Sequence, residues 1–137
     1  MLYHATFRRN IQGIKELGLM SVKDKYWKDS LDGIVCLATD EYAAESYCEV
    51  AMDMSDDETL WEEDIIVLGV KEENLDLTNN KLINDPHMIL EENQEPTTYA
   101  YTGTIPANEL YVFVCKNLKT ICVGKLMELT DIPKFSS

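Results

Sequence analysis

The chain has 137 residues, of which 45% are hydrophobic, and its formal net charge is −13 at pH 7. This length and composition favour one folded domain over residues 1–137 and exclude a chain that is disordered by composition. So acidic a surface repels a phosphate backbone, which disfavours direct nucleic-acid binding. No apolar run is as long as a membrane span and no signal peptide opens the sequence, so we expect no membrane contact and a cytoplasmic location.

Metal binding is not expected either. The four cysteines form no CxxC pair, and the chain contains only two histidines. A zinc site needs a closer grouping of such ligands. We therefore predict buried free thiols in a reducing compartment and no metal centre.

The first part of the chain predicts two strand–helix pairs. Residues 2–5 form a short strand, and the helix after it is capped by Asn10 and ended by Gly18. A polar loop covers residues 21–32. Residues 34–38 form a buried strand, and Thr39 or Asp40 caps a helix that runs to Val50.

The rest of the chain predicts mainly strands. Residues 53–64 form a solvated acidic segment that lacks the glycine of a calcium loop. Residues 65–70 form a strand with a short extension at 75–77, and residues 79–96 form a long loop with one helical turn near 87–90. A strand at 97–104 and a hairpin at 110–116 and 120–123 complete the order. Helices early and strands late indicate an α+β domain.

His4 and Thr6 are the first candidate site residues. Alternation along a strand places both side chains on one side, where they can bond ribose hydroxyls, and the peptide of Ala5 can meet an amide of a ligand. The alternative is a half-buried strand histidine whose ring is satisfied by the protein.

Two blocks of sequence resemble one enzyme superfamily. His4-Ala5-Thr6, Asn10 and Gly18-Leu19 resemble the His-Gly-Ser strand end, asparagine and Gly-Leu helix end of the ADP-ribosyltransferases. The likeness is to the diphtheria-toxin-like branch, which includes the poly(ADP-ribose) polymerases. Residues 33–40 and 43–47 resemble the strand–helix unit of that branch, which ends in a tyrosine. The two blocks span about the first third of the chain.

The resemblance implies an ADP-ribosyltransferase-like α+β fold with split, mixed or antiparallel sheets, and NAD as the substrate. His4 would contact the nicotinamide ribose, and the backbone of Ala5 would bond the carboxamide. Thr6 would support the adenosine-side ribose, with Asn10 beside it in the NAD-binding motif. Tyr47 would stack on the nicotinamide ring, unless it is a core aromatic of its helix.

The sequence departs from the family at three positions. Cys36 stands where the family has a tyrosine in the nicotinamide pocket, and Ala44 stands near its carboxamide-binding serine. The catalytic glutamate of the family opens a later strand, where it stabilises an oxocarbenium-like transition state through the ribose 2′-hydroxyl. That position falls at residues 97–99, so Glu95 is the first candidate for this carboxylate and Glu109 the second.

Two arginines follow the first strand. In an otherwise acidic chain, Arg8 and Arg9 beside the expected pocket could bind the NAD pyrophosphate. The alternative is a surface pair near a helix start.

Three functions follow from these residues. The first is an NAD-dependent mono-ADP-ribosyltransferase that modifies a protein and cleaves the nicotinamide–ribose bond. The second is a catalytically inactive protein of the same fold, an acidic inhibitor of phage or defence origin that imitates nucleic acid. The third is a small NAD-consuming hydrolase or toxin. The tRNA 2′-phosphotransferases share the fold and the opening motif, but the charge of −13 argues against RNA as a substrate.

Overall fold

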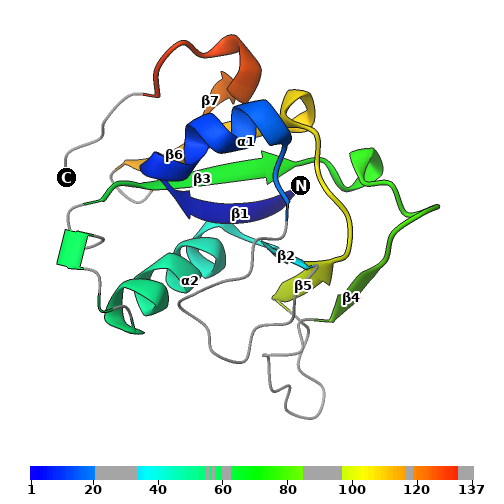
Figure 1. The fold of residues 1–137 in the computed structure, drawn as a ribbon, viewed down its shortest axis with the longest axis horizontal. Coiled ribbons are helices and arrows are strands. Elements are labelled where there is room, and N and C mark those ends of the chain that lie inside the picture. Colours follow the sequence, from blue (N-terminus) through cyan, green and yellow to red (C-terminus); the bar gives the residue numbers. More distant parts are fainter. Residues whose placement is uncertain are drawn as a thin grey trace.

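The computed structural model describes residues 1–20, 34–54, 56, 58–59, 63–84, 97–116 and 119–132. In this part of the chain, seven strands form one sheet in the order β4-β5-β2-β1-β3-β6-β7, and every neighbouring pair is antiparallel (Figure 1). The strands and helices are β1 (Leu2–Phe7), α1 (Ile11–Leu17), β2 (Val35–Ala38), α2 (Glu41–Met54), β3 (Ile65–Val70), β4 (Leu82–Asn84), β5 (Thr98–Tyr101), β6 (Tyr111–Lys116) and β7 (Lys119–Lys125).

The α+β class and antiparallel pairing are confirmed, but the expected split into separate sheets is wrong for the described strands. The reason is the position of β1, which pairs with β3 on one side and β2 on the other. Its pairing with β3 runs over six residue pairs, whereas its pairing with β2 consists of Tyr3 with Ala38. We call this narrow junction the β1–β2 seam. The sheet is continuous, and at this junction β1 and β2 are paired through a single pair of residues.

The two helices cover opposite faces of the sheet, on either side of β1 (Figure 1). Leu2 packs in one apolar cluster with Ile11 and Ile14 of α1. Ala5 packs in another cluster with Ala44 of α2. Because side chains alternate along a strand, even-numbered residues of β1 lie on the α1 face and odd-numbered ones on the α2 face.

The first strand–helix pair agrees with the sequence except at the helix start. β1 extends to Phe7, and Gly18 ends α1 with the expected positive φ of 83°. Asn10 precedes the helix, but its side chain makes no capping bond. The cap prediction is wrong because Asn10 itself has a helical backbone conformation, at the end of the preceding turn, and its Nδ2 donates to the Thr6 hydroxyl. A short helical turn, η1 (Arg8–Asn10), links β1 to α1.

The second helix begins as predicted. The Asp40 carboxylate accepts a 2.7 Å hydrogen bond from the backbone N–H of Ala43, so Asp40 caps α2 and Thr39 does not provide this bond. The helix continues past Val50 to Met54, into the segment that was predicted to be solvated acidic chain.

The region after β3 differs most from prediction. Residues 75–77 form a turn and not a strand extension, because the Asp76 carboxylate accepts the backbone N–H groups of Thr78 and Asn79. The long loop expected at 79–96 contains β4. The helical turn predicted near 87–90 lies outside the described residues. The short turns η3 (Glu72–Asn74) and η4 (Ala107–Glu109) were not predicted.

The C-terminal half confirms the hairpin of β6 and β7. The strand predicted at 97–104 is shorter, since β5 ends at Tyr101. A short turn, η5 (Leu126–Glu128), leads into a segment that lies over α1 (Figure 1). The buried-thiol prediction holds for Cys48 and is wrong for Cys122, which is exposed on the edge strand β7. No helix in the described residues is long and apolar enough to span a bilayer.

Candidate functional site

His4 lies at the β1–β2 seam, one residue past the Tyr3–Ala38 pair. Its side chain is half-buried, and its Nδ1 atom is 2.8 Å from the carbonyl oxygen of Cys36. A carbonyl oxygen only accepts hydrogen bonds, so Nδ1 carries the proton. In a neutral imidazole this tautomer makes Nε2 an acceptor. The seam therefore fixes both the orientation and the tautomer of the ring.

Thr6 is the second predicted site residue on this face. Its side chain is 7% exposed, and its Oγ1 accepts a 3.1 Å hydrogen bond from Nδ2 of Asn10. A hydroxyl that accepts one bond still has a proton to donate. Asn10 therefore orients the Thr6 hydroxyl, and the structure brings His4, Thr6 and Asn10 together at the start of the chain. The contacts of these residues with NAD stay predictions.

Ala5 lies between them on the strand, but its side chain is on the other face. It is 9% exposed and packs in the apolar cluster of α2. Only its backbone is therefore available for the contact that the resemblance implies. The ladder between β1 and β2 stops at Tyr3, so the peptide groups near Ala5 lie where the two strands no longer pair in register.

Three predicted residues lie on the α2 side. Cys36 alternates with Val35 and Leu37, which belong to the core on the α1 face, so its side chain points away from His4. Ala44 is buried against the sheet. Tyr47 belongs to α2, but its side chain is outside the described part of the structure. The structure therefore joins His4 to the backbone of Cys36 and not to its thiol.

The carboxylate predicted beside His4 is not on β5. Ala38, which pairs with Tyr3, also pairs with Thr98 of β5, and the next step pairs Leu37 with Tyr99. Tyr99 thus lies at the level of His4, on the same face and across β2. Glu95 lies outside the described residues. The sequence predicted the carboxylate position only as the range 97–99, and the register of β2 and β5 places Tyr99 at the level of His4.

Glu109 does not lie on a strand that neighbours the His4 end of β1. It lies in η4, before β6, and β3 separates β6 from β1. Its side chain is half-buried, and η4 contacts α1. Glu109 therefore leads into a strand that does not adjoin the β1–β2 seam.

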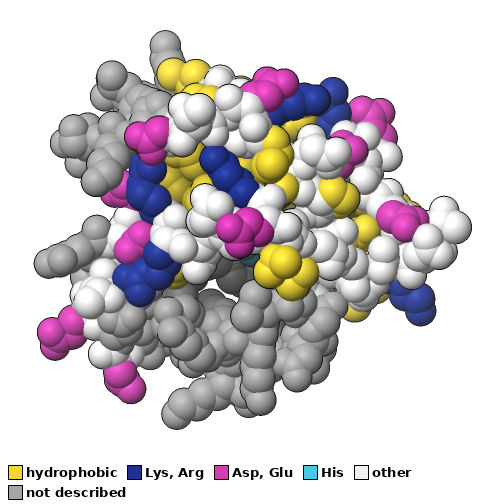
Figure 2. Space-filling model, turned by 45° about the horizontal axis from the view of Figure 1, so that its top comes forward, with side chains coloured by type: hydrophobic (Ala, Val, Ile, Leu, Met, Phe, Trp, Pro, Cys, Tyr) yellow, Lys and Arg dark blue, Asp and Glu magenta, His cyan; other side chains and the backbone are white. Residues whose placement is uncertain are grey.

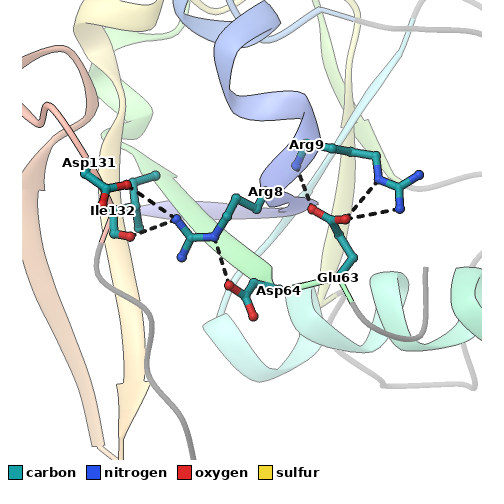
Figure 3. Close-up of polar contacts among 6 residues, drawn as sticks. All are labelled: Arg8, Arg9, Glu63, Asp64, Asp131 and Ile132. Atoms are coloured by element: carbon teal, nitrogen blue, oxygen red, sulfur yellow. Dashed lines mark hydrogen bonds and ion pairs between the residues drawn. The ribbon is translucent and has the colours of Figure 1, made fainter. Parts of the chain in front are cut away.

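Arg8 and Arg9 bind the protein itself (Figure 3). Arg8 donates from Nε to Asp64 Oδ2 at 2.8 Å and from Nη1 to the carbonyl of Ile132 at 2.7 Å. Arg9 donates from Nε to Glu63 Oε2 at 3.1 Å and from Nη2 to the Thr59 hydroxyl at 3.0 Å. These contacts favour a structural role for both arginines, and the pyrophosphate contact stays a prediction.

Tyr3, the residue next to His4, has a phenol with a shifted pKa. The sequence did not indicate this group. Its ring meets Phe113 edge-on, with 5.2 Å between centroids. Burial raises the pKa of the Tyr3 phenol above its ordinary value, and Glu41, Cys122 and Asp40 raise it further. Tyr3 faces α2, so it and His4 lie on opposite sides of the same strand.

The charged surface around α1 is mixed. Figure 2 shows Lys and Arg side chains scattered among acidic and hydrophobic ones on this face, without a continuous basic track. A phosphate backbone is normally followed by such a track, and the exclusion of nucleic acid as a partner stays a prediction. No protein-family model, curated protein or solved structure matches the chain.

Proposed function

We propose that this protein is an NAD-dependent mono-ADP-ribosyltransferase with an ADP-ribosyltransferase-like fold, and that it modifies a protein. The observation that carries the proposal is the contact of His4 with the Cys36 carbonyl, which holds the ring at the seam through Nδ1. Sequence resemblance first indicated this residue, and a neutral ring held through Nδ1–H would present Nε2 as an acceptor toward a ribose hydroxyl.

The order of the strands adds support. The resemblance assigns NAD contacts to β1 and to the strand–helix unit of β2 and α2, and it assigns the catalytic carboxylate to the start of a later strand. In the sheet, β5, β2 and β1 are direct neighbours. Three segments that are far apart in the sequence thus converge at one part of the sheet.

The proposed NAD contacts come from both faces of the sheet. His4 and Thr6 lie on the α1 face, whereas α2 lies on the other. We expect the nicotinamide to lie near the β1–β2 seam, on the His4 side. In the reaction, an acceptor side chain replaces nicotinamide at the ribose carbon, and a carboxylate takes the acceptor's proton and stabilises the cationic sugar.

One observation favours the second candidate, an inactive binding protein of this fold. At the level of His4, β5 presents Tyr99 in place of a carboxylate. Unless Glu95 reaches the site, the chain would lack the group that stabilises the transition state. The acidic surface would then be the functional feature, and a basic protein its target.

Transfer of a tagged NAD to lysate proteins separates the two candidates. We expect a labelled band with wild type, no band with His4→Ala, and the wild-type band with Gln12→Ala, a control at an exposed position of α1. Equal labelling by His4→Ala would refute the site. If wild type gives no labelled band and releases no nicotinamide, the binding protein is favoured. Nicotinamide release without labelling would indicate the hydrolase.

Two further variants test the remaining residues of the site. Tyr47→Ala should weaken NAD binding through loss of a stacked ring, as titration calorimetry would measure. Glu95→Gln should lower turnover, while Glu109→Gln should not, because Glu109 leads into β6, which β3 separates from β1. The reverse ranking would reassign the catalytic carboxylate.

A further inference from the structure

The turn η1 connects the two ends of the candidate site. Thr6 lies in β1 just before η1, and Asn10, which binds the Thr6 hydroxyl, is the last residue of the turn. The relative placement of these two side chains therefore depends on the conformation of residues 8 and 9. Neither residue of that pair is buried, so packing alone does not fix the turn.

Arg9 anchors the turn at one point. The Glu63 carboxylate accepts the backbone N–H of Arg9 through Oε1 at 2.9 Å and its Nε through Oε2 at 3.1 Å. One carboxylate thus holds both the main chain and the side chain of Arg9, a two-point contact that restricts rotation. The exposed fractions of the paired side chains, 36% for Arg9 and 20% for Glu63, leave this anchor partly screened by solvent.

Arg8 anchors the turn more extensively. Its backbone N–H donates to the Asp64 carbonyl at 3.0 Å, and its Nε donates to the Asp64 carboxylate. Its Nη1 donates to the Ile132 carbonyl, with Asp131 3.9 Å away (Figure 3). The Arg8 side chain is 23% exposed. The planar guanidinium can serve these directions at once, which a lysine ammonium on a flexible stem cannot.

Residues 126–132, which we call the C-terminal strap, provide the second half of this anchor. Leu126 is fully buried and Ile132 is 3% exposed, in the same core as Ile11 and Ile14 of α1. Lys15 of α1 donates to the Leu129 carbonyl at 2.8 Å. The strap is thus tied to α1 by Lys15 and to η1 by Arg8.

We infer that Arg8 is a positioning residue for the His4–Thr6 site, and that it acts by holding η1, and with it Asn10, against residue 64 and the C-terminal strap. This inference rests on the proposed function for its catalytic consequence, but not for its structural one. It differs from the pyrophosphate contact considered from the sequence, because the guanidinium already donates to acceptors of the protein.

Three variants test the inference. Arg8→Met keeps most of the side-chain stem and removes the side-chain donors, whereas Arg8→Lys keeps the charge and reaches one acceptor at a time. Lys15→Met is the matched control, because it removes the other bond to the strap and leaves η1 anchored. The readouts are NMR signals of the Asn10 side-chain amide and the His4 ring, unfolding by urea, and steady-state transfer from tagged NAD.

We expect Arg8→Met to shift the Asn10 and His4 signals and to lower kcat by about tenfold with little change in KM, since a displaced group weakens the transition state. Arg8→Lys should recover part of the loss, and Lys15→Met should match wild type in signals and turnover. A raised KM with unchanged kcat would overturn the inference in favour of a phosphate contact. Equal effects of Arg8→Met and Lys15→Met would mean that Arg8 only stabilises the fold and does not position the site.

The proposed function can fail without the inference failing. If wild type transfers no label, the NMR signals alone decide, because they report the Thr6–Asn10 contact in the folded protein. Shifted signals in Arg8→Met but not in Lys15→Met would then support the positioning role. Unchanged Asn10 and His4 signals in folded Arg8→Met would overturn it, whatever the activity.

Discussion

The Nδ1 atom of His4 lies 2.8 Å from the carbonyl oxygen of Cys36, across two strands whose register consists of Tyr3 with Ala38. The His4 side chain thus links β1 to β2 beyond the point where the backbone pairing of the two strands stops. The same bond therefore fixes the tautomer of the candidate site residue and helps to close the narrowest junction of the sheet.

This dual role predicts separable effects at position 4. His4→Ala should lower the free energy of unfolding by about 0.5–1.5 kcal/mol, the usual net value of one hydrogen bond. His4→Gln retains an N–H donor, so it should keep most of that stability and still lose transfer from NAD. Urea unfolding together with the labelling assay measures both quantities. A stable His4→Gln protein with full activity would contradict the assignment.

The raised pKa of Tyr3 predicts an alkaline effect. Because the folded state favours the neutral phenol, its contribution to stability is complete below the ordinary pKa of 10.0 and is lost as the pH rises through the folded value. Wild type should therefore lose stability above about pH 10 more steeply than Tyr3→Phe. Urea midpoints measured across this range test the difference, and parallel curves would place Tyr3 in an ordinary environment.

Asp76 predicts an effect of the opposite sign in acid. Hydrogen bonds from the side chain and backbone of Asn79, with a further one from Thr78, hold the pKa of its carboxyl below the ordinary value of 3.8. Its contribution is present above that value and disappears as the pH falls through the folded pKa. Asp76→Asn should flatten the loss of stability in this acid range. Thermal midpoints measured at a series of pH values below neutrality would show it.

Two glycines offer a matched pair of alanine substitutions. A Cβ on Gly69 of β3 would lie 2.4 Å from the Phe113 ring and 2.7 Å from the Met1 sulfur, whereas one on Gly13 of α1 would meet nothing within 4 Å. Gly69→Ala should destabilise the fold by about 1–3 kcal/mol through overpacking. Gly13→Ala should stabilise it by about 0.4–1 kcal/mol. Similar values for the two would mean that the Phe113 ring moves aside at little cost.

Local chemistry explains which elements the sequence predicted. Gly18 ends α1 because a positive φ suits glycine, and Asp40 caps α2 because a short carboxylate reaches a free N–H group two or three residues on. Both signals lie within a few positions of the structure that they determine. The hairpin of β6 and β7 is predictable for the same reason.

The errors arose where a partner outside the local pattern competed. Asn10 is a residue type that often caps helices, but it belongs to the turn η1 and its side chain turns back to the Thr6 hydroxyl. Leu75 and Leu77 alternate like a strand, yet the Asp76 side chain binds the backbone N–H groups of a turn. β4 has three residues, too few for periodicity to indicate a strand.

The site was predictable in its residues and not in its assembly. The His4–Thr6 spacing could be read from the chain, because alternation places both on one face. That the Cys36 carbonyl would hold the ring, while the Cys36 thiol faces α2, depends on a register that spacing does not contain. The hydrogen bonds of Arg8 with Asp64 and Ile132 could not be predicted from the sequence either, because these partners are 56 and 124 positions away.

The central place of β1 in the sheet has a consequence for how the chain folds. Although β1 is the first strand in the sequence, its environment is complete only when β2, β3 and the last described residues are in place. Contacts of such long sequence separation close late and slow the folding of a domain. His4 and Thr6 therefore acquire their native surroundings near the end of folding, and a pulse-labelling experiment should find the amides of β1 protected after those of the β6–β7 hairpin.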